Sequence, residues 1–312
     1  MQQQVTLREL ENFVAVAENS SMTHGAAAVG ISQPAMSGSI QSLERTLGVS
    51  LLVRHRGHGV SLTPEGAQLI AEAREVLSRA ADITSFMFDS GSDSVGRVLL
   101  GSLVTVAPIV VPAMVREFTD RNPQIDVRLQ TGTQDDLLAW LRSGEIHAAI
   151  TYDIELGNDL DFLKLLDAEP HALLPTGHAL ATAETVSLEE LADEPYVLLD
   201  LPISRQYLTS LFLAADVSLR PVARHTDLDL IRTLVGNGFG FSVVNLLPAA
   251  ATAQDGSRLA YVKLRTSVKP VALGLVRRKG GTQSRRLEEF VQFALTYHVL
   301  PSRRPDAGNG SL

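Results

Sequence analysis

The residues from 32 to 41 carry side chains that could read the edges of DNA bases. One side of a predicted helix, which Ser32 is placed to cap, would present amides, a hydroxyl and a ring: Gln33, Pro34, Ser37 and Gln41. Glutamine can form two hydrogen bonds to adenine, serine can bond to any base, and a proline ring can touch a thymine methyl group. The other side is apolar at helical spacing, which predicts a buried face at Met36, Ile40, Leu43 and Leu47. The alternative is an ordinary solvated helix face.

A hairpin is predicted directly after this helix. Residues 51–64 contain two short β-like runs around a turn rich in glycine and histidine. Placed beside the helix as a wing, the hairpin would bring Arg54, Arg56 and His58 near phosphates or the minor groove.

Two shorter helices are expected before residue 32. Thr6 and Glu9 have the spacing of a capping box, and an apolar stripe follows at Leu7, Leu10, Phe13, Val14 and Ala17. Thr23 can cap the second helix and is a further candidate DNA contact. Small residues at 25–28 would let another helix approach closely, and Gly30 ends the segment. Residues 1–63 are therefore predicted to form an α-rich winged helix-turn-helix.

A long helix is predicted over residues 64–92, ending near Ser90 in a serine- and glycine-rich linker. Its apolar residues repeat at alternating spacings of four and three: Leu69, Ala73, Val76, Ala80, Ile83 and Met87. Such a heptad seam favours pairing with a second copy of the helix. Packing against the chain's own body would produce the same pattern.

From Gly96 onward, strands and helices alternate, which predicts an α/β domain with mostly parallel sheets. Strands are expected at 98–101, 125–129, 147–150, 172–174, 196–199, 241–245 and 271–276. Helices are expected at 111–119, 134–141, 188–191, 205–214, 228–235 and 284–295.

Polar residues follow the carboxyl ends of several of these strands, where open α/β sheets bind ligands. The candidates for effector binding are Ser102, Thr105, Thr131, Thr133, Tyr152, Pro202, Ser204, Thr226 and Asn245. Hydroxyls at helix N-termini favour an anion, so we expect a small carboxylate-bearing effector, held above all by Ser102, Thr133 and Ser204. Serine and threonine also cap helices without binding any ligand.

Composition excludes several other classes of site. The 312 residues contain no cysteine, which removes disulfides, thiol redox sensing and thiolate metal ligands. The histidines show no metal-binding spacing, and no nucleophile–base motif or cofactor fingerprint is present, so no enzyme, metal or cofactor is predicted. The glycines at 236–240 follow a helix and precede a strand, the reverse of a phosphate loop. Without a signal peptide or an apolar run of roughly 18 residues, we expect a cytoplasmic chain that does not enter a membrane.

The formal net charge of −8 argues against a nucleic-acid partner, because DNA-binding surfaces are usually basic. Residues 24–63, however, hold three arginines against one acidic residue, a local charge of +2. Such a thin patch predicts weak DNA binding by one copy, with oligomerisation supplying the rest.

The chain resembles the LysR-type transcriptional regulators over about residues 5–300. The resemblance rests on the segments 32–37, 40–48, 51–54 and 62–66, in that order. Gly38 departs from the family pattern, and so does Gly25 in the second helix. Gly38 removes a base or phosphate contact, so carry-over of base recognition is safest at Gln33, Pro34 and Ser37.

The resemblance implies double-stranded operator DNA as a partner and an effector-binding domain at 93–300 with a periplasmic-binding-protein-like fold. Its first lobe would comprise 93–166 and 269–300, its second lobe 167–268, with crossings near 166–168 and 266–269; residues 301–312 would form a flexible tail. A homodimer or a homotetramer built as a dimer of dimers is implied, with RNA polymerase as a candidate partner. A solute-binding protein and another winged-helix sensor are the alternatives.

Overall fold

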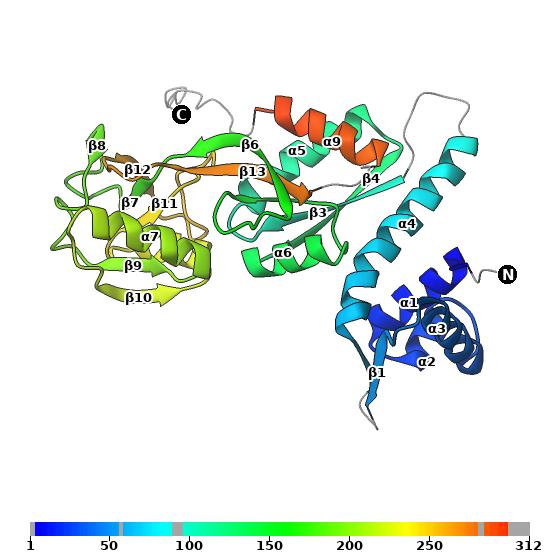
Figure 1. Ribbon diagram of the computed structural model, residues 1–312. Helices are drawn as coiled ribbons and strands as arrows, with labels where there is room; N and C mark the ends of the chain where they lie inside the picture. Colours follow the sequence, from blue (N-terminus) through cyan, green and yellow to red (C-terminus); the bar gives the residue numbers. More distant parts are fainter. Residues whose placement is uncertain (1–3, 56–58, 89–95, 280–283, 299–312) are drawn as a thin grey trace.

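The computed structural model describes residues 4–55, 59–88, 96–279 and 284–298. It consists of a small helical domain, a long helix and two α/β lobes arranged side by side (Figure 1). The predictions for Arg56, His58 and the tail at 301–312 lie outside the described residues. Within the described ranges, no helix is long and apolar enough to cross a membrane.

The helical domain has the predicted order of three helices and a hairpin. Its elements are α1 (Leu7–Asn19), α2 (Met22–Ala28), α3 (Gln33–Leu47), β1 (Leu52–His55) and β2 (Gly59–Leu62). The capping box of Thr6 and Glu9 is present at the start of α1. At α2, Ser21 caps the helix and Thr23 does not, because the helix begins one residue before Thr23.

The core of this domain lies between α1, α3 and the hairpin. Phe13, Val16, Met36, Ile40 and Leu43 are fully buried there. Two members of the predicted apolar faces are exposed: Leu7 in the first turn of α1 and Leu47, which is 38% exposed at the end of α3. Both lie at helix ends, where a helix has left the core that its central turns contact.

The long helix α4 (Pro64–Phe88) begins at a fixed corner. The Thr63 hydroxyl accepts a hydrogen bond from the Gly66 amide (3.0 Å) and donates one to the Ser50 carbonyl (2.7 Å). Gly66 is needed there, because a Cβ atom would lie 2.1 Å from the Leu51 carbonyl oxygen. The first turns of α4 are therefore part of the helical domain's core, and the rest of α4 lies beside the first lobe (Figure 1).

The first lobe is a five-stranded mixed sheet in the order β4-β3-β5-β13-β6. The bounds are β3 (Gly96–Leu103), β4 (Ile125–Gly132), β5 (Ala148–Tyr152), β6 (Leu160–Ala168) and β13 (Val271–Arg278). Helices α5 (Ala107–Arg121) and α9 (Arg285–Thr296) pack together through Phe118 and Phe290, whose ring centroids are 5.0 Å apart. Figure 1 shows α6 (Gln134–Arg142) on the opposite face.

The second lobe contains a four-stranded sheet in the order β11-β7-β12-β8 and the parallel pair β10-β9. A single bridge between Tyr196 and Phe241 connects the two. The bounds are β7 (His171–Pro175), β8 (Thr185–Val186), β9 (Tyr196–Leu199), α7 (Pro202–Ala214), β10 (Pro221–His225), α8 (Leu228–Gly236), β11 (Ser242–Val244) and β12 (Leu259–Leu264). The chain passes between the lobes at 168–171 and 264–271, next to the predicted crossings.

The prediction of mostly parallel sheets is wrong. Strand β13 runs antiparallel to both β5 and β6, and β7 runs antiparallel to both β11 and β12. The reason is that the chain returns from the second lobe through β13, which must pair against the direction of the outgoing strand β6. Four strands were not predicted (β6, β8, β10 and β12), and residues 188–191 form a turn instead of the predicted helix.

Candidate DNA interface and effector cleft

The outer face of α3 is available to a partner. Gln33, Pro34 and Gln41 are exposed, whereas Met36 and Ile40 on the opposite face are fully buried. The Ser32 hydroxyl caps the helix by accepting a hydrogen bond from the Ala35 amide (3.4 Å). The polar and apolar residues therefore divide as an amphipathic recognition helix requires.

Two contacts position α3 relative to the rest of the domain. The Glu44 carboxylate accepts hydrogen bonds from the amides of Leu51 (2.8 Å) and Leu52 (3.3 Å), which fixes the start of the hairpin against the helix. The buried Asn12 side chain donates to the Ser39 hydroxyl (2.8 Å) and joins α1 to α3. Sequence reasoning missed both residues, because each bonds to a segment outside its own helix.

The hairpin lies next to the recognition face as predicted. Arg54 donates from Nη2 to the Ser37 hydroxyl (3.3 Å), so the first wing strand and α3 present one continuous polar surface. At the other strand, the Val60 amide donates to the Ser20 carbonyl (2.9 Å). Gly59, at φ +85°, leaves room for that contact, since a Cβ atom would lie 2.4 Å from the same carbonyl oxygen.

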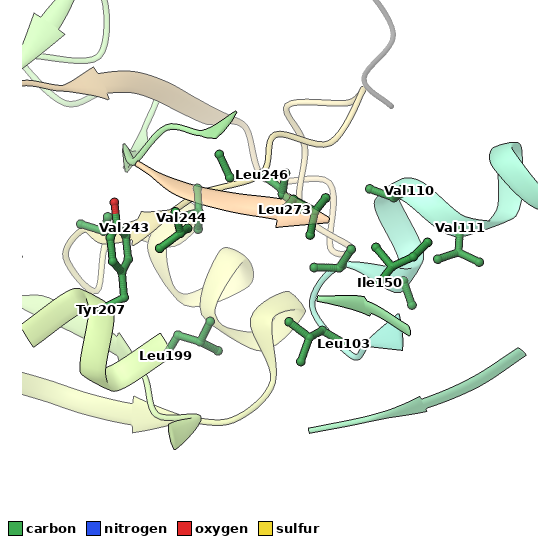
Figure 2. Packing of buried hydrophobic residues seen from close by; sticks show 14 of the residues in the cluster. Leu103, Val110, Val111, Ile150, Leu199, Tyr207, Val243, Val244, Leu246 and Leu273 are labelled. Carbon is green, nitrogen blue, oxygen red and sulfur yellow. The ribbon is translucent and has the colours of Figure 1, made fainter. Parts of the chain in front are cut away.

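A cleft of about 740 Å³ separates the two lobes. The first lobe contributes residues from the β3–α5 turn and the start of α6, and the second lobe contributes the start of α8 and residues 244–249. Two narrow recesses of about 20 and 40 Å³ adjoin it, and both share Thr105 with the cleft. Figure 2 shows the buried side chains on either side of this region, with Leu103 and Ile150 from the first lobe and Leu199 and Val244 from the second.

Most of the predicted effector residues line this space. The cleft or its recesses include Thr105, Thr133, Tyr152, Pro202, Ser204, Thr226 and Asn245. Ser102 and Thr131 line neither. Ser102 is fully buried in β3, where its hydroxyl donates to the Leu103 carbonyl (3.4 Å), and Thr131 is exposed on the edge strand β4.

The predicted cluster of three hydroxyl caps is not present. Ser102 lies within a strand, and Ser204 lies in the first turn of α7, whose N-cap residue Leu201 makes no side-chain cap bond. Thr133 does cap α6, in a reciprocal pair with Asp136. Hydrogen bonds from Thr133 lower the pKa of the Asp136 carboxyl, which places an anionic group at that helix N-terminus already.

The cleft also holds a polar network that sequence reasoning missed. Arg232 donates from Nη1 to Asp229 (3.2 Å), from Nε to the Tyr261 hydroxyl (3.2 Å), and from Nη2 to the carbonyls of Ala250 (3.3 Å) and Thr252 (2.7 Å). The spacing of Asp229 and Arg232 on one helix is a weak local signal. The other partners come from β12 and the loop at 250–252, which only the folded chain brings together.

Two further polar residues, Asn245 and Tyr152, line the recesses beside the cleft. Asn245 donates to the Ala168 carbonyl (3.1 Å), which joins the end of β11 to the end of the crossing strand β6. Burial raises the pKa of the Tyr152 phenol well above its ordinary value, with Tyr207 as a second cause. Tyr152 is therefore neutral at physiological pH and can act only as a hydrogen-bonding group.

Three side chains of α4, those of Glu72, Arg74 and Glu75, bond to the first lobe. Arg278 on β13 forms ion pairs with Glu75 and Glu72, the latter at 3.7 Å. Arg74 donates to the Ser143 carbonyl (2.8 Å) after α6 and pairs with Glu18 of α1 (3.0 Å). Arg74 of α4 therefore contacts both the first lobe and the helical domain.

Comparison with known proteins identifies both halves of the chain. The model of the bacterial regulatory helix-turn-helix proteins of the lysR family matches residues 7–67, and that of the LysR substrate binding domain matches residues 91–298. The OxyR regulator of Escherichia coli is 28% identical over 292 residues, covering 92% of this chain and 94% of its own.

No group of three or more acidic or histidine side chains suited to a metal occurs among the described residues.

Two solved structures have the same architecture. HinK, a LysR family transcriptional regulator from Pseudomonas aeruginosa, superposes with a TM-score of 0.62 at 30% identity, covering 94% of this chain and 98% of HinK. A full-length OxyR variant from the same organism gives a TM-score of 0.76 at 22% identity, covering 96% of this chain and the whole of that one. Both superpositions therefore extend over the helical domain, the long helix and the two lobes.

Proposed function

This chain belongs to the LysR family of bacterial transcriptional regulators, and we propose that a small molecule in the interlobe cleft controls how its α3 and wing bind operator DNA. The observation that carries the proposal is the cleft of about 740 Å³, which both lobes line and which one lobe connects to α4. Its relatives are regulators and not enzymes.

For the DNA half of the proposal, α3 enters the major groove. Gln33, Pro34 and Gln41 supply base contacts from the exposed face, with Ser37 at its edge and Ser32 at the helix start. Arg54 would contact phosphate from the wing, with Arg56 and His58 as expected neighbours. Thr23, exposed on α2, stays a candidate contact.

For the effector half, ligand binding changes the angle between the lobes. The first lobe transmits that change through two contacts with α4. Arg278 of the lobe pairs with Glu75 of α4, and Arg74 of α4 donates a hydrogen bond to the Ser143 carbonyl of the lobe. An effector can shift the DNA-bound arrangement only by its difference in affinity for the two states, typically about 1–3 kcal/mol.

The names of several relatives connect them with hydrogen peroxide, and this property is not transferred. Peroxide sensing by a thiol requires a cysteine that can be oxidised. The 312 residues contain none. A reversibly bound small molecule is therefore the signal that we propose.

Self-association through α4 is part of the proposal, with a homodimer as the unit and a dimer of dimers as the larger assembly. Leu69 and Ala73 pack in the core of their own DNA-binding domain, which leaves Val76, 41% exposed, and Ala80 as the described positions of the seam. The side chains of Ile83 and Met87 lie outside the described residues. Such a regulator would act in the cytoplasm, where genomic DNA and RNA polymerase are.

Gel-shift titration on a promoter fragment that the parent protein selects from genomic DNA tests the DNA half. Gln33→Ala should weaken binding by about 1–3 kcal/mol and relax base preference, because the amide reads a base edge. Arg54→Ala should weaken binding to all sequences alike and flatten the salt dependence. The matched control is Gln292→Ala, an exposed glutamine on α9. Parent-like binding by Gln33→Ala and Arg54→Ala would refute the assignment of this surface.

A further inference from the structure

We propose that the interlobe cleft selects an uncharged, mainly apolar small molecule and discriminates against the small carboxylate that the sequence suggested. This inference rests on the proposed function, since it names the chemical class of the effector. Four features of the cleft support it. These are the volume of the cleft, its apolar walls, the hydrogen bonds that its one cationic side chain already makes, and the carboxylates that already lie at nearby helix N-termini.

The size and walls of the cleft suit an apolar ligand. Its volume of about 740 Å³ lies within the range of about 300–1,000 Å³ that small-molecule sites occupy. Apolar side chains face each other across it: Val104 and Ile109 from the first lobe, and Leu228, Leu246, Leu247 and Pro248 from the second. A ligand with a broad apolar surface would bury that surface against both walls, which favours binding.

The lining contains one cationic side chain, Arg232, and it is already committed. Its guanidinium donates to a carboxylate, a phenol and two backbone carbonyls, and it is mostly buried. Asp229 neutralises it, and Asp227 adds a second carboxylate to the lining. The lining charges therefore sum to −1, so a buried anionic ligand would meet repulsion in place of a counter-ion.

The helix N-termini around the cleft offer little to an anion. At α8, the Asp227 carboxylate accepts hydrogen bonds from the amides of Asp229 (2.9 Å) and Leu230 (3.2 Å). At α6, the carboxylate of Asp136 in the first turn accepts a hydrogen bond from the amide of the N-cap residue Thr133 (2.9 Å). Helices α5 and α7 begin without side-chain caps, and Pro108 and Pro202 remove one N–H donor from each of their first turns. At α6 and α8, the chain's own carboxylates take the role that a ligand carboxylate would have.

Two fluorescent probes with one aromatic framework test this inference. Phenylnaphthylamine is uncharged, and anilinonaphthalene sulfonate carries one negative charge on the same rings. Titrated against the full-length protein, the neutral probe should bind at least about tenfold more tightly. Equal or tighter binding of the sulfonate would overturn the inference.

Variants assign the probe to the cleft. Val104 lines the cleft and is 39% exposed, so Val104→Asp can be tolerated by the fold while adding a charge to the apolar wall. It should weaken binding of the neutral probe by about tenfold or more. The matched control is Val222→Asp, because Val222 is 63% exposed on β10 and outside the cleft lining. Equal probe binding by these two variants would contradict the location.

A third variant tests the charge argument directly. Asp227→Asn keeps a capping oxygen and removes one negative charge from the lining, so it should strengthen binding of the sulfonate by more than it changes binding of the neutral probe. Asp193→Asn, an exposed site outside the cleft lining, is the control and should change neither. An unchanged sulfonate affinity in Asp227→Asn would count against the inference. None of these outcomes depends on operator binding, so they are distinguishable from a failure of the Gln33→Ala gel-shift test.

Discussion

The outer face of α3 and the interlobe cleft differ in how far their polar side chains are already engaged. Within the described residues, the side chains of Gln33 and Gln41 make no hydrogen bond and project from an exposed surface. In the cleft, Arg232 makes four hydrogen bonds to groups of its own chain. A surface for a large polar partner keeps its donors and acceptors open, whereas a cleft with satisfied polar groups selects ligands by shape and apolar contact.

The largest expected effect tests whether the buried face of α3 stabilises the domain that presents its exposed face. Met36 is fully buried, so Met36→Ala should destabilise the DNA-binding domain by about 2–5 kcal/mol. Leu47 is 38% exposed at the helix end, so Leu47→Ala should cost less than about 1 kcal/mol. Denaturant unfolding followed by circular dichroism measures both. Equal losses would mean that α3 packs along its whole apolar stripe, as the sequence pattern alone predicts.

The next effect separates α4 as an interface from α4 as part of the core. Val76→Asp would place an unpaired charge in the proposed dimer seam, which should raise the dimer dissociation constant by at least about tenfold. Val222→Asp introduces the same charge on β10 and should leave association unchanged. Sedimentation velocity at micromolar concentration distinguishes them. A parent protein that sediments as a monomer, or a Val76→Asp variant that sediments like the parent, would rule out the seam.

A smaller effect concerns the first lobe, whose wall contains a half-buried histidine. Burial, and secondarily the charge of Arg278, lower the pKa of His147 below its ordinary value, and its Nδ1 accepts a hydrogen bond from the Leu99 amide (3.0 Å). Because the unfolded chain binds this proton more readily, stability should be unaffected above about pH 6.5 and should fall as the pH drops below that value.

Thermal unfolding at about pH 7 and about pH 5.5 tests this effect. The variant His147→Asn keeps an acceptor near the position of Nδ1 but does not titrate, so it should lose less stability than the parent over that interval. A parent and a variant that lose the same stability would show that other groups account for the acid sensitivity.

The two regions also differ in how much of them the sequence could predict. Thr6 with Glu9, Ser32 and the hairpin are local features, because each depends on residues within a few positions of one another, and all are present. Strand β6 escaped prediction because its run from Leu160 to Ala168 does not alternate between apolar and polar residues, and only its two end residues are buried. The contacts of Arg232 with Tyr261 and Thr252 depend on the tertiary fold, and no spacing in the sequence encodes them.

The predicted effector residues lie largely at the cleft, whereas the predicted cluster of three hydroxyl caps is not present. The rule that ligands bind beyond the carboxyl ends of strands located Thr105, Thr133 and Ser204 near the cleft. It did not exclude Ser102, because β3 continues to Leu103, two residues beyond the predicted end of the strand, and Ser102 therefore lies buried within the sheet. Nor could it show that Asp136 and Asp227 already occupy helix N-termini at the cleft, since their partners are apparent only once the helix starts are known.

The central claim is that cleft occupancy and operator binding are coupled, and filling the cleft tests it without knowledge of the effector. Val104→Trp places an indole on the cleft wall, and Val222→Trp places one on the exposed face of β10. Operator affinity, measured by fluorescence anisotropy on one labelled duplex, should change by at least about fivefold in Val104→Trp and remain at the parent value in Val222→Trp. If the parent and both variants bind the operator with the same affinity, the cleft does not control DNA binding.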